Sequence, residues 1–329
     1  MRRAALLLAA LLAAPGAARA WRLFGEPSDG KVRPVQELND AGKPRAVLAA
    51  LTPEFLQTLR GTDLRQAYIL MGDSHDKLGK PDQAISDYQL GVTLFPKNVD
   101  LLSRQGMLLH REGLDQQARP LLLRVLAIEP NHGLAHQGLA EIDRKLGFLD
   151  RSASHYEIAL EAADKRADLW RDYAEVLLAM RDDRTADLAL RRALQLDPKN
   201  PEAHVLFAFA RRARNDYPAA LSALDDSAAL GAGEGAQRAK ALFLLEAGRL
   251  DEAAAQAELI LRAVPGDGAA LWVLGRVKLA RGDDEGAIHA LEGVKAADAS
   301  NVFAAQAAKT LILEARLHES RQEEERYRK

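Results

Sequence analysis

RQAYILMGDSHDKLGKPDQAISDYQLGVTLFPKN, residues 65–98, is the stretch that decides the fold of this chain. Tyr68 and Gly72 begin a series of apolar or small residues at helical spacing, which predicts a first helix. Residues 79–82, GKPD, break the pattern, and a second segment with the same spacing ends at Pro96. A helix pair this small cannot bury its apolar faces alone, so it needs neighbours of the same kind.

The stretch recurs along the chain. Pro96, Pro130 and Pro198 are separated by one and then two periods of 34 residues. Cutting at this period gives seven repeats: 65–98, 99–132, 133–166, 167–200, 201–233, 234–267 and 268–301. The eighth residue of each repeat is small: Gly72, Gly106, Ala140, Ala174, Ala208, Ala241 and Gly275. The twentieth is also small: Ala84, Ala118, Ser152, Ala186, Ala220, Ala253 and Ala287. The twenty-fourth is bulky except for Ala257: Tyr88, Leu122, Tyr156, Leu190, Leu224 and Leu291.

Small residues at two fixed positions allow the two helices of one repeat to cross closely, at about 8–10 Å between axes. Together with the 34-residue period, the closing proline and Trp170 at a fourth position, they resemble the tetratricopeptide repeat (TPR) family. The resemblance covers residues 65–301. It implies an all-α fold, a right-handed superhelical solenoid of antiparallel helix pairs with capping helices at both ends.

The first twenty residues are predicted to be a secretory signal peptide. Arg2 and Arg3 precede an uninterrupted Ala/Leu run, and Ala18-Arg19-Ala20 has the form of a cleavage site. The apolar run is shorter than the roughly 20 residues of a membrane-spanning helix, so no stable membrane insertion is expected after cleavage following Ala20. The chain has no cysteine, which excludes a bacterial lipoprotein. The Ala/Leu/Arg-rich composition indicates a bacterial source, and we therefore expect an exported protein of the periplasm.

Three further segments flank the repeats. Residues 21–34 are polar and aperiodic, and are interpreted as an extended arm. Residues 35–64 contain two short helical patterns around Gly42-Lys43-Pro44 and are predicted to form a degenerate helical hairpin that caps the first repeat. Residues 302–329 are predicted to begin as a capping helix and to end as a charged tail.

No catalytic, cofactor or metal site is predicted, and the chain is not expected to be an enzyme. The absence of cysteine excludes thiolate nucleophiles and cysteine-ligated metals. His132 and His136 have the spacing of a chelating pair but no third ligand is apparent, and Gly231-x-Gly233-x-Gly235 follows a predicted helix instead of a strand, so it is interpreted as a turn between repeats. A net charge of −2 with mixed signs gives no case for nucleic-acid binding.

The resemblance implies that the first helices of the repeats line a concave groove, faced by the second, fifth, ninth and twelfth residues of each repeat. In repeats 1 to 4 these positions hold many acids: Gln66, Ile69, Asp73, Asp76, Asp100, Ser103, Met107, His110, Leu134, Gln137, Glu141, Arg144, Asp168, Arg171, Glu175 and Leu178. Repeats 5 to 7 hold Glu202, Val205, Phe209, Arg212, Gly235, Arg238, Leu242, Leu245, Ala269, Trp272, Arg276 and Leu279. The lysine/asparagine pattern by which some family members grip a C-terminal carboxylate is missing.

Apolar side chains rimmed by arginines predict a peptide or helix site in repeats 5 to 7. The predicted site residues are Val205, Phe209, Arg212, Arg238, Leu242, Leu245, Trp272 and Arg276. The leading hypothesis is a periplasmic scaffold that binds another envelope protein there and supports assembly of a complex. The alternative is self-association, in which the groove receives the arm or tail of a second copy; an enzyme or small-ligand protein is the third hypothesis.

Overall fold

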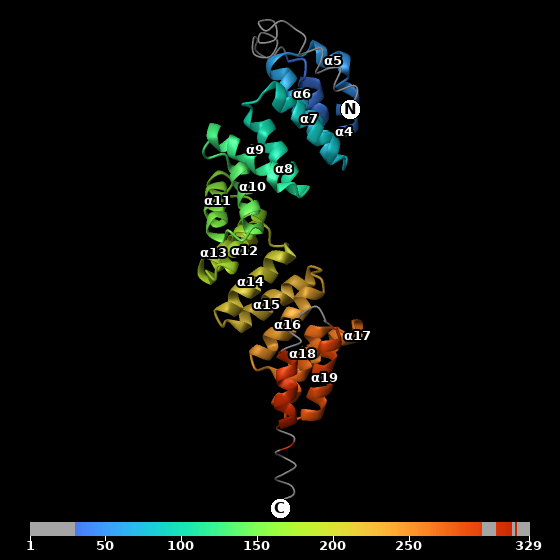
Figure 1. Cartoon of the computed structure of the whole chain (residues 1–329), viewed down its shortest axis with the longest axis vertical. Coiled ribbons are helices and arrows are strands. Elements are labelled where there is room, and N and C mark those ends of the chain that lie inside the picture. Colours follow the sequence, from blue (N-terminus) through green and yellow to red (C-terminus); the bar gives the residue numbers. More distant parts are fainter. Residues whose placement is uncertain (1–29, 298–306, 318–319, 321–329) are drawn as a thin grey trace, which may run out of the picture. The chain divides into compact units, whose positions relative to one another are not determined.

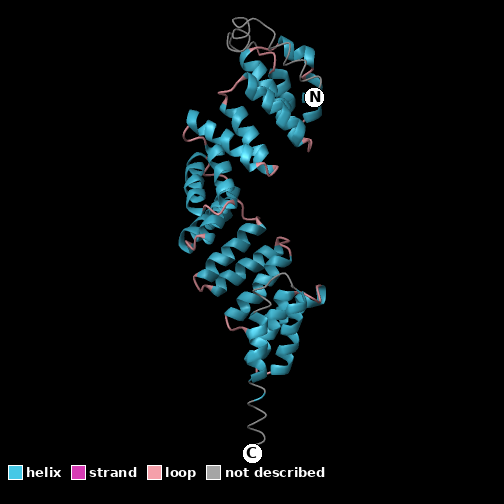
Figure 2. Ribbon diagram, in the orientation of Figure 1, coloured by secondary structure: helices cyan, strands magenta, loops and turns pink. Residues whose placement is uncertain are grey.

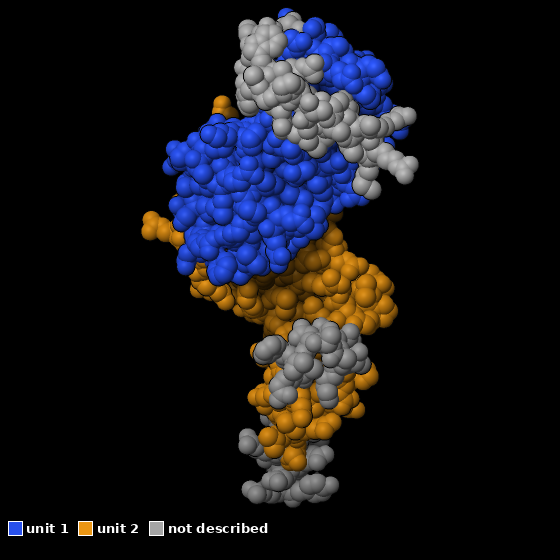
Figure 3. Space-filling model, turned by 45° about the horizontal axis from the view of Figure 1, so that its top comes forward, with its two compact units in different colours: residues 1–164 blue, residues 165–329 orange. Residues whose placement is uncertain are grey.

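The structure is a computed structural model that describes residues 30–297, 307–317 and 320. All regular secondary structure in these residues is helical (Figure 2). The chain divides into two compact units, Met1–Asp164 and Lys165–Lys329 (Figure 3). The division falls at Asp164, the position at which the 34-residue period predicts a closing proline.

Between residues 30 and 164, unit 1 contains three short helices followed by three helix pairs (Figure 1). The short helices are α3 (Arg33–Asp40), α4 (Pro44–Ala50) and α5 (Pro53–Thr58). The pairs are α6 (Gly61–Lys77) with α7 (Pro81–Leu94), α8 (Val99–Arg111) with α9 (Asp115–Ile128), and α10 (Gly133–Lys145) with α11 (Leu149–Ala162). The predicted hairpin around Gly42-Lys43-Pro44 is therefore present as α3 and α4.

Unit 2 contains four helix pairs and a final helical segment. The pairs are α12 (Ala167–Ala179) with α13 (Asp183–Leu196), α14 (Pro201–Ala213) with α15 (Tyr217–Ala229), α16 (Glu234–Glu246) with α17 (Leu250–Ala263), and α18 (Gly268–Ala280) with α19 (Asp284–Ala297). The final segment is 307–317. Each of the seven predicted repeats thus contains one helix pair, which confirms the all-α repeat prediction.

The small residues of the first helices face the bulky residue at position 24 of their own repeat. A Cβ atom added to Gly72 would lie 2.3 Å from Cε1 of Tyr88, and one added to Gly106 would lie 2.7 Å from Cδ2 of Leu122. Both distances are shorter than van der Waals contact allows. The eighth position therefore sets how closely the two helices of a repeat approach.

The core of each unit is built from these contacts along the stack. In unit 1 a continuous buried cluster runs from Val32 to Ile142. In unit 2 a second cluster runs from Ala208 to Val277. At the end of unit 2, Ala308 and Ile312 of segment 307–317 pack with Leu291 of α19, so this segment caps the last repeat as predicted. Its continuation, 321–329, lies outside the described residues.

The interpretation of residues 21–34 as an extended arm is wrong for its last residues. Lys31 and Val32 form a turn, Arg33 begins α3, and Val32 is buried in the core of unit 1. The backbone N–H of Lys31 donates a hydrogen bond to Oδ2 of Asp63 at 3.0 Å. The rest of the predicted arm, 21–29, and the predicted signal peptide, 1–20, lie outside the described residues.

Candidate functional site

The eight predicted site residues lie on α14, α16 and α18, the first helices of repeats 5 to 7 in unit 2. Phe209 and Arg276 have exposed side chains, and the other six are half-buried. The half-buried residues are Val205, Arg212, Arg238, Leu242, Leu245 and Trp272. None of the eight is fully buried, so all belong to the surface or its margin.

Phe209 is the exposed apolar residue of the predicted site. Its side chain is 38% exposed, and its ring meets the buried ring of Phe243 edge to face with centroids 5.2 Å apart. The guanidinium of Arg212 lies 5.3 Å above the other ring, that of Phe243. This packing holds an aromatic side chain at the surface in a fixed orientation.

The arginines predicted to receive a partner's acids are already paired within the chain. Nε and Nη2 of Arg212 donate to both carboxylate oxygens of Glu246, at 2.6 and 2.7 Å. Arg238 donates from Nε to Asp267 at 2.5 Å and from Nη2 to Glu234 at 2.7 Å. Asp267 in turn caps α18 by accepting from the N–H of Ala270. Arg212 therefore joins repeats 5 and 6, and Arg238 joins α16 to the residue that caps α18.

The apolar residues of the predicted site other than Phe209 are partly buried against the core of unit 2. Val205, Leu242 and Leu245 pack against the core cluster of unit 2. Trp272 packs against the cluster that contains Leu291 and Ile312, so it helps to hold the capping segment. Sequence reasoning missed this role because the cluster forms only when α18, α19 and segment 307–317 come together in the folded unit.

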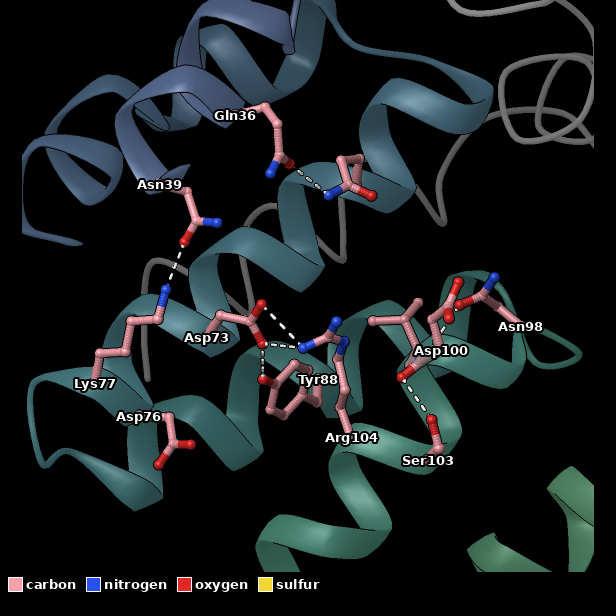
Figure 4. A network of polar contacts seen from close by, with 12 residues as sticks. Gln36, Asn39, Asp73, Asp76, Lys77, Tyr88, Asn98, Asp100, Ser103 and Arg104 are labelled. Atoms are coloured by element: carbon pink, nitrogen blue, oxygen red, sulfur yellow. Dashed lines mark hydrogen bonds and ion pairs between the residues drawn. The ribbon is translucent and has the colours of Figure 1, made fainter. Parts of the chain in front are cut away.

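In unit 1 two of the predicted groove acids, Asp73 and Asp76, are paired within the chain, and Figure 4 shows the contacts of Asp73. Asp73 accepts from the Tyr88 hydroxyl at 2.6 Å and from Nη1 of Arg104 at 2.8 Å. Asp76 is paired with Arg111 of α8. Gln36 and Gln66 are joined at 2.8 Å, which links α3 to α6. Asp73 and Asp76 thus connect the first helices of repeats 1 and 2, whereas Asp100 at the start of α8 is exposed.

His110 lies between two carboxylates of unit 1. Its Nδ1 is 2.6 Å from Oδ1 of Asp115, and its Nε2 is 3.1 Å from Oε2 of Glu141. The hydrogen bond with Glu141 is the largest cause that raises the pKa of His110 above its ordinary value. Burial pushes the pKa of Glu141 upward, but hydrogen bonds from His110 and Gln137 outweigh burial and hold it below its ordinary value.

The stability of unit 1 should therefore decrease both at high pH, because of His110, and at low pH, because of Glu141. The contribution of His110 is complete below about pH 6.5, the pKa of an unfolded histidine, and is lost as the pH rises through the higher folded pKa. The contribution of Glu141 is present above its unfolded pKa of about 4.5 and is lost as the pH falls through its lower folded pKa. We expect a maximum between about pH 4.5 and 6.5 in urea unfolding.

The matched variants are His110→Gln and, as control, His289→Gln at an exposed position of α19. The first should flatten the decline above pH 6.5, and the second should leave it unchanged. An NMR titration that places the pKa of His110 at or below that of an unfolded histidine would contradict the stabilisation of its charged form by Asp115 and Glu141.

A second polar cluster lies buried between repeats 2 and 3. Asp143 of α10 is 0% exposed and pairs with Nη1 of Arg119 at 2.7 Å and Nη2 of Arg151 at 3.1 Å. His136 donates from Nε2 to the carbonyl of Pro130 at 2.8 Å, and its Nδ1 lies 2.8 Å from Nδ1 of His155. Sequence reasoning missed Asp143 because it is not at a predicted groove position.

The rejected motifs have structural roles. His132 caps α10, with its Nδ1 accepting from the N–H of Ala135 at 3.3 Å. The glycine segment 231–235 forms the turn between α15 and the start of α16. No group of three or more metal-ligating side chains is found among the described residues. None of the described helices is long and apolar enough to span a membrane.

Comparison with known families agrees with this architecture. Two tetratricopeptide repeat models match, one at residues 69–132 and 205–268 and the other at 244–312, which together is more than half of the chain. The chain belongs to the tetratricopeptide repeat family. TPR proteins bind other proteins through such stacks, so the coarse function of this chain is that of a protein-interaction scaffold.

Two curated relatives resemble part of the chain. Human tetratricopeptide repeat protein 7B is 28% identical over 138 residues, which is 42% of this chain and 16% of the human protein. The BBSome complex member bbs-4 of Caenorhabditis elegans is 25% identical over 130 residues, 40% of this chain and 28% of that protein. The matched region therefore spans less than a third of either relative.

Two solved TPR structures share the fold. PilF of Pseudomonas aeruginosa superimposes with a TM-score of 0.55 and 17% identity, covering 63% of this chain and 94% of that chain. A tetratricopeptide repeat protein of Parabacteroides merdae superimposes with a TM-score of 0.52 and 15% identity, covering 76% and 98%. At these identities the likeness concerns the fold alone.

Proposed function

We propose that this TPR protein is a non-enzymatic, exported scaffold that binds a protein or peptide segment along the first helices of unit 2. The observation that carries the proposal is Phe209, an exposed aromatic side chain fixed against Phe243. Aromatic residues that are exposed but rigid contribute strongly to protein binding, because little conformational freedom is lost when a partner covers them.

The ion pairs of Arg212 and Arg238 within the chain limit which arginine can contact a partner. Since Arg212 and Arg238 are held by Glu246 and Asp267, they keep the surface rigid and leave Arg276 as the exposed arginine of the predicted site. The partner segment then places an apolar side chain on Phe209 and an acid near Arg276. The proposal assigns no residue to catalysis, because the carboxylates and histidines described above cap helices or pair with side chains of the same or the next repeat.

The location in the cell envelope rests on the sequence. Arg2, Arg3, the Ala/Leu run and Ala18-Arg19-Ala20 have the order of a cleaved export signal. A scaffold exported in this way would meet envelope proteins, and we propose that it supports assembly or positioning of an envelope complex.

A photo-crosslinking experiment tests both parts. A photoreactive phenylalanine analogue is placed at Phe209 and, as the matched control, at Leu188, which is 61% exposed on α13 of the same unit. We expect a crosslinked envelope protein at position 209 and none at 188. Mass spectra of the same samples should show a mature chain that begins at Trp21.

Equal crosslinking at the two positions, or none at 209, would contradict the binding site. A peptide that still contains the Ala20–Trp21 bond in the mature protein would contradict export by cleavage at that point.

A further inference from the structure

Segment 307–317, which caps the last repeat, has apolar side chains on two of its faces. Ala308 and Ile312 are buried and pack with Leu291 of α19. Leu313 and Leu317 lie outside this cluster, and their side chains are 52% and 60% exposed. Among the exposed large apolar residues of the described part of the chain, these two are the pair that lies one helical turn apart. We call Leu313 and Leu317 the end stripe.

The preceding repeat shows what normally covers such a stripe. Leu271 and Leu279 of α18 and Ile288 of α19 pack against the cluster that contains Ile312, so the helices of repeat 7 are covered by the segment that follows them. In the part of the chain that the structure describes, no element follows segment 307–317 in the same way. The end stripe therefore lacks the helical cover that α18 and α19 receive.

The residues after the segment do not have the composition of a cover. Residues 318–329, HESRQEEERYRK, contain eight Arg, Lys or Glu side chains and one large apolar residue, Tyr327. A segment of this composition has no apolar face with helical spacing. The element that covers the end stripe must then come from another molecule.

The charges on either side of the end stripe favour a second copy in antiparallel orientation. Lys309, before the stripe, is exposed, and Glu323–Glu325 follow it in the sequence. A parallel pair of these helices would place Lys309 beside Lys309 of the second copy and the glutamates beside each other. An antiparallel pair places the lysine of one copy beside the glutamates of the other.

Helical geometry defines the register of the antiparallel pair. When the pair is centred on Ala315, Leu313 of one copy lies at the level of Leu317 of the other, so each leucine meets a leucine. Lys309 lies near Ser320 of the second copy, and Glu324 follows Ser320 by one turn on the same flank. Glu314 and Arg321 belong to the other flank, so neither flank carries charges of one sign.

We propose that the end stripe joins two copies of the chain in this antiparallel helix pair. Two half-exposed leucines from each copy bury far less than the roughly 800 Å² per partner of a standard interface, so the dimer is weak, with a dissociation constant on the order of 100 µM. The end stripe contains none of the eight predicted site residues. Each copy therefore keeps its own site, and the dimer becomes a bivalent scaffold.

Sedimentation equilibrium of the full chain over a range of concentrations tests the association. We expect a monomer–dimer equilibrium that weakens at least tenfold in the variant L313Q/L317Q. The matched control is L188Q/L259Q, which changes two exposed leucines of α13 and α17 and should associate as the unaltered chain does. Circular dichroism verifies that both variants remain folded.

Disulfide crosslinking tests the orientation. The chain has no cysteine, so introduced cysteines report the register without background. In the antiparallel pair, Lys309 lies close to the level of Ser320 of the second copy, whereas the two Lys309 residues are about 18 Å apart along the helix axis. A mixture of K309C and S320C chains should form a linked dimer under mild oxidation, and K309C alone should give at most a tenth of that yield.

Three results would overturn the proposal: a monomer at all concentrations up to about 500 µM, an unchanged dimer in L313Q/L317Q, or an equal yield of linked dimer from K309C alone. Binding to lipid vesicles that is lost in L313Q/L317Q, while the chain stays monomeric, would assign the end stripe to a membrane surface instead. Because Phe209 is not part of the end stripe, none of these results bears on the crosslinking at that position.

Discussion

Replacing Asp143 with alanine should lower the free energy of unfolding of unit 1 by about 3 kcal/mol. The carboxylate is fully buried and holds the guanidinium groups of Arg119 and Arg151, which come from the helices on either side of α10. Its removal leaves two cations facing one another without a counter-ion. The side chains of Arg119 and Arg151 are 26% and 52% exposed, so water can solvate both guanidinium groups after the carboxylate is removed. We therefore expect a loss in the free energy of unfolding near the lower end of the range measured when one partner of a buried ion pair is removed.

The measurement is urea unfolding combined with hydrogen exchange of the backbone amides of α10 and α11. Glu161→Ala is the control, because this exposed acid lies on α11 of the same repeat. It should change the free energy of unfolding by less than about 0.5 kcal/mol. A loss of similar size in the two variants would show that the buried cluster contributes nothing beyond an ordinary surface charge.

Gly72→Ala should destabilise unit 1 by about 2 kcal/mol, although alanine is the better helix former. Helix propensity alone would favour alanine by about 1 kcal/mol. The new Cβ atom, however, would lie 2.3 Å from Cε1 and 2.6 Å from Cζ of Tyr88. That ring is 3% exposed and its hydroxyl is held by Asp73 at 2.6 Å, so moving it breaks a hydrogen bond as well as the packing.

A second substitution provides the test of the cause. Leucine faces alanine in repeats 4 and 5, so Gly72→Ala combined with Tyr88→Leu should lose the steric conflict. We expect the pair to show a favourable coupling energy of about 1–2 kcal/mol in a double-mutant cycle. Gly235→Ala, at a helical glycine with open space around it, is the control and should be neutral or slightly stabilising. Additive effects of the Gly72 and Tyr88 substitutions would rule out the contact as the origin.

Repeat 3 shows why the sequence alone misleads here. It combines Ala140 with Tyr156, and both are fully buried, so alanine can face tyrosine where the ring has been placed for it. A comparison of repeats by sequence therefore predicts that Gly72→Ala is harmless. The structure predicts instead that Gly72→Ala is destabilising, because Asp73 holds the Tyr88 hydroxyl and so keeps the ring against Gly72.

The predicted groove residues show the same limit at the candidate site. Residue type and repeat position correctly place Phe209 and Arg276 at the surface. They do not reveal that Arg212 pairs with Glu246 of the next repeat, or that Trp272 packs against the cluster of Leu291 and Ile312, because these contacts depend on how successive helices stack.

The stretch 65–98 and its recurrence determine the helix-pair architecture of the chain without any structure. A 34-residue period, small residues at two positions and a proline stop require helix pairs that stack, because one pair cannot bury its own apolar face. Only the tertiary structure decided which polar side chains are available. Asp73, Asp76 and Arg212 are paired with residues of the next repeat, whereas Phe209 and Arg276 are left exposed. This difference depends on distances between repeats, which the period of the sequence does not determine.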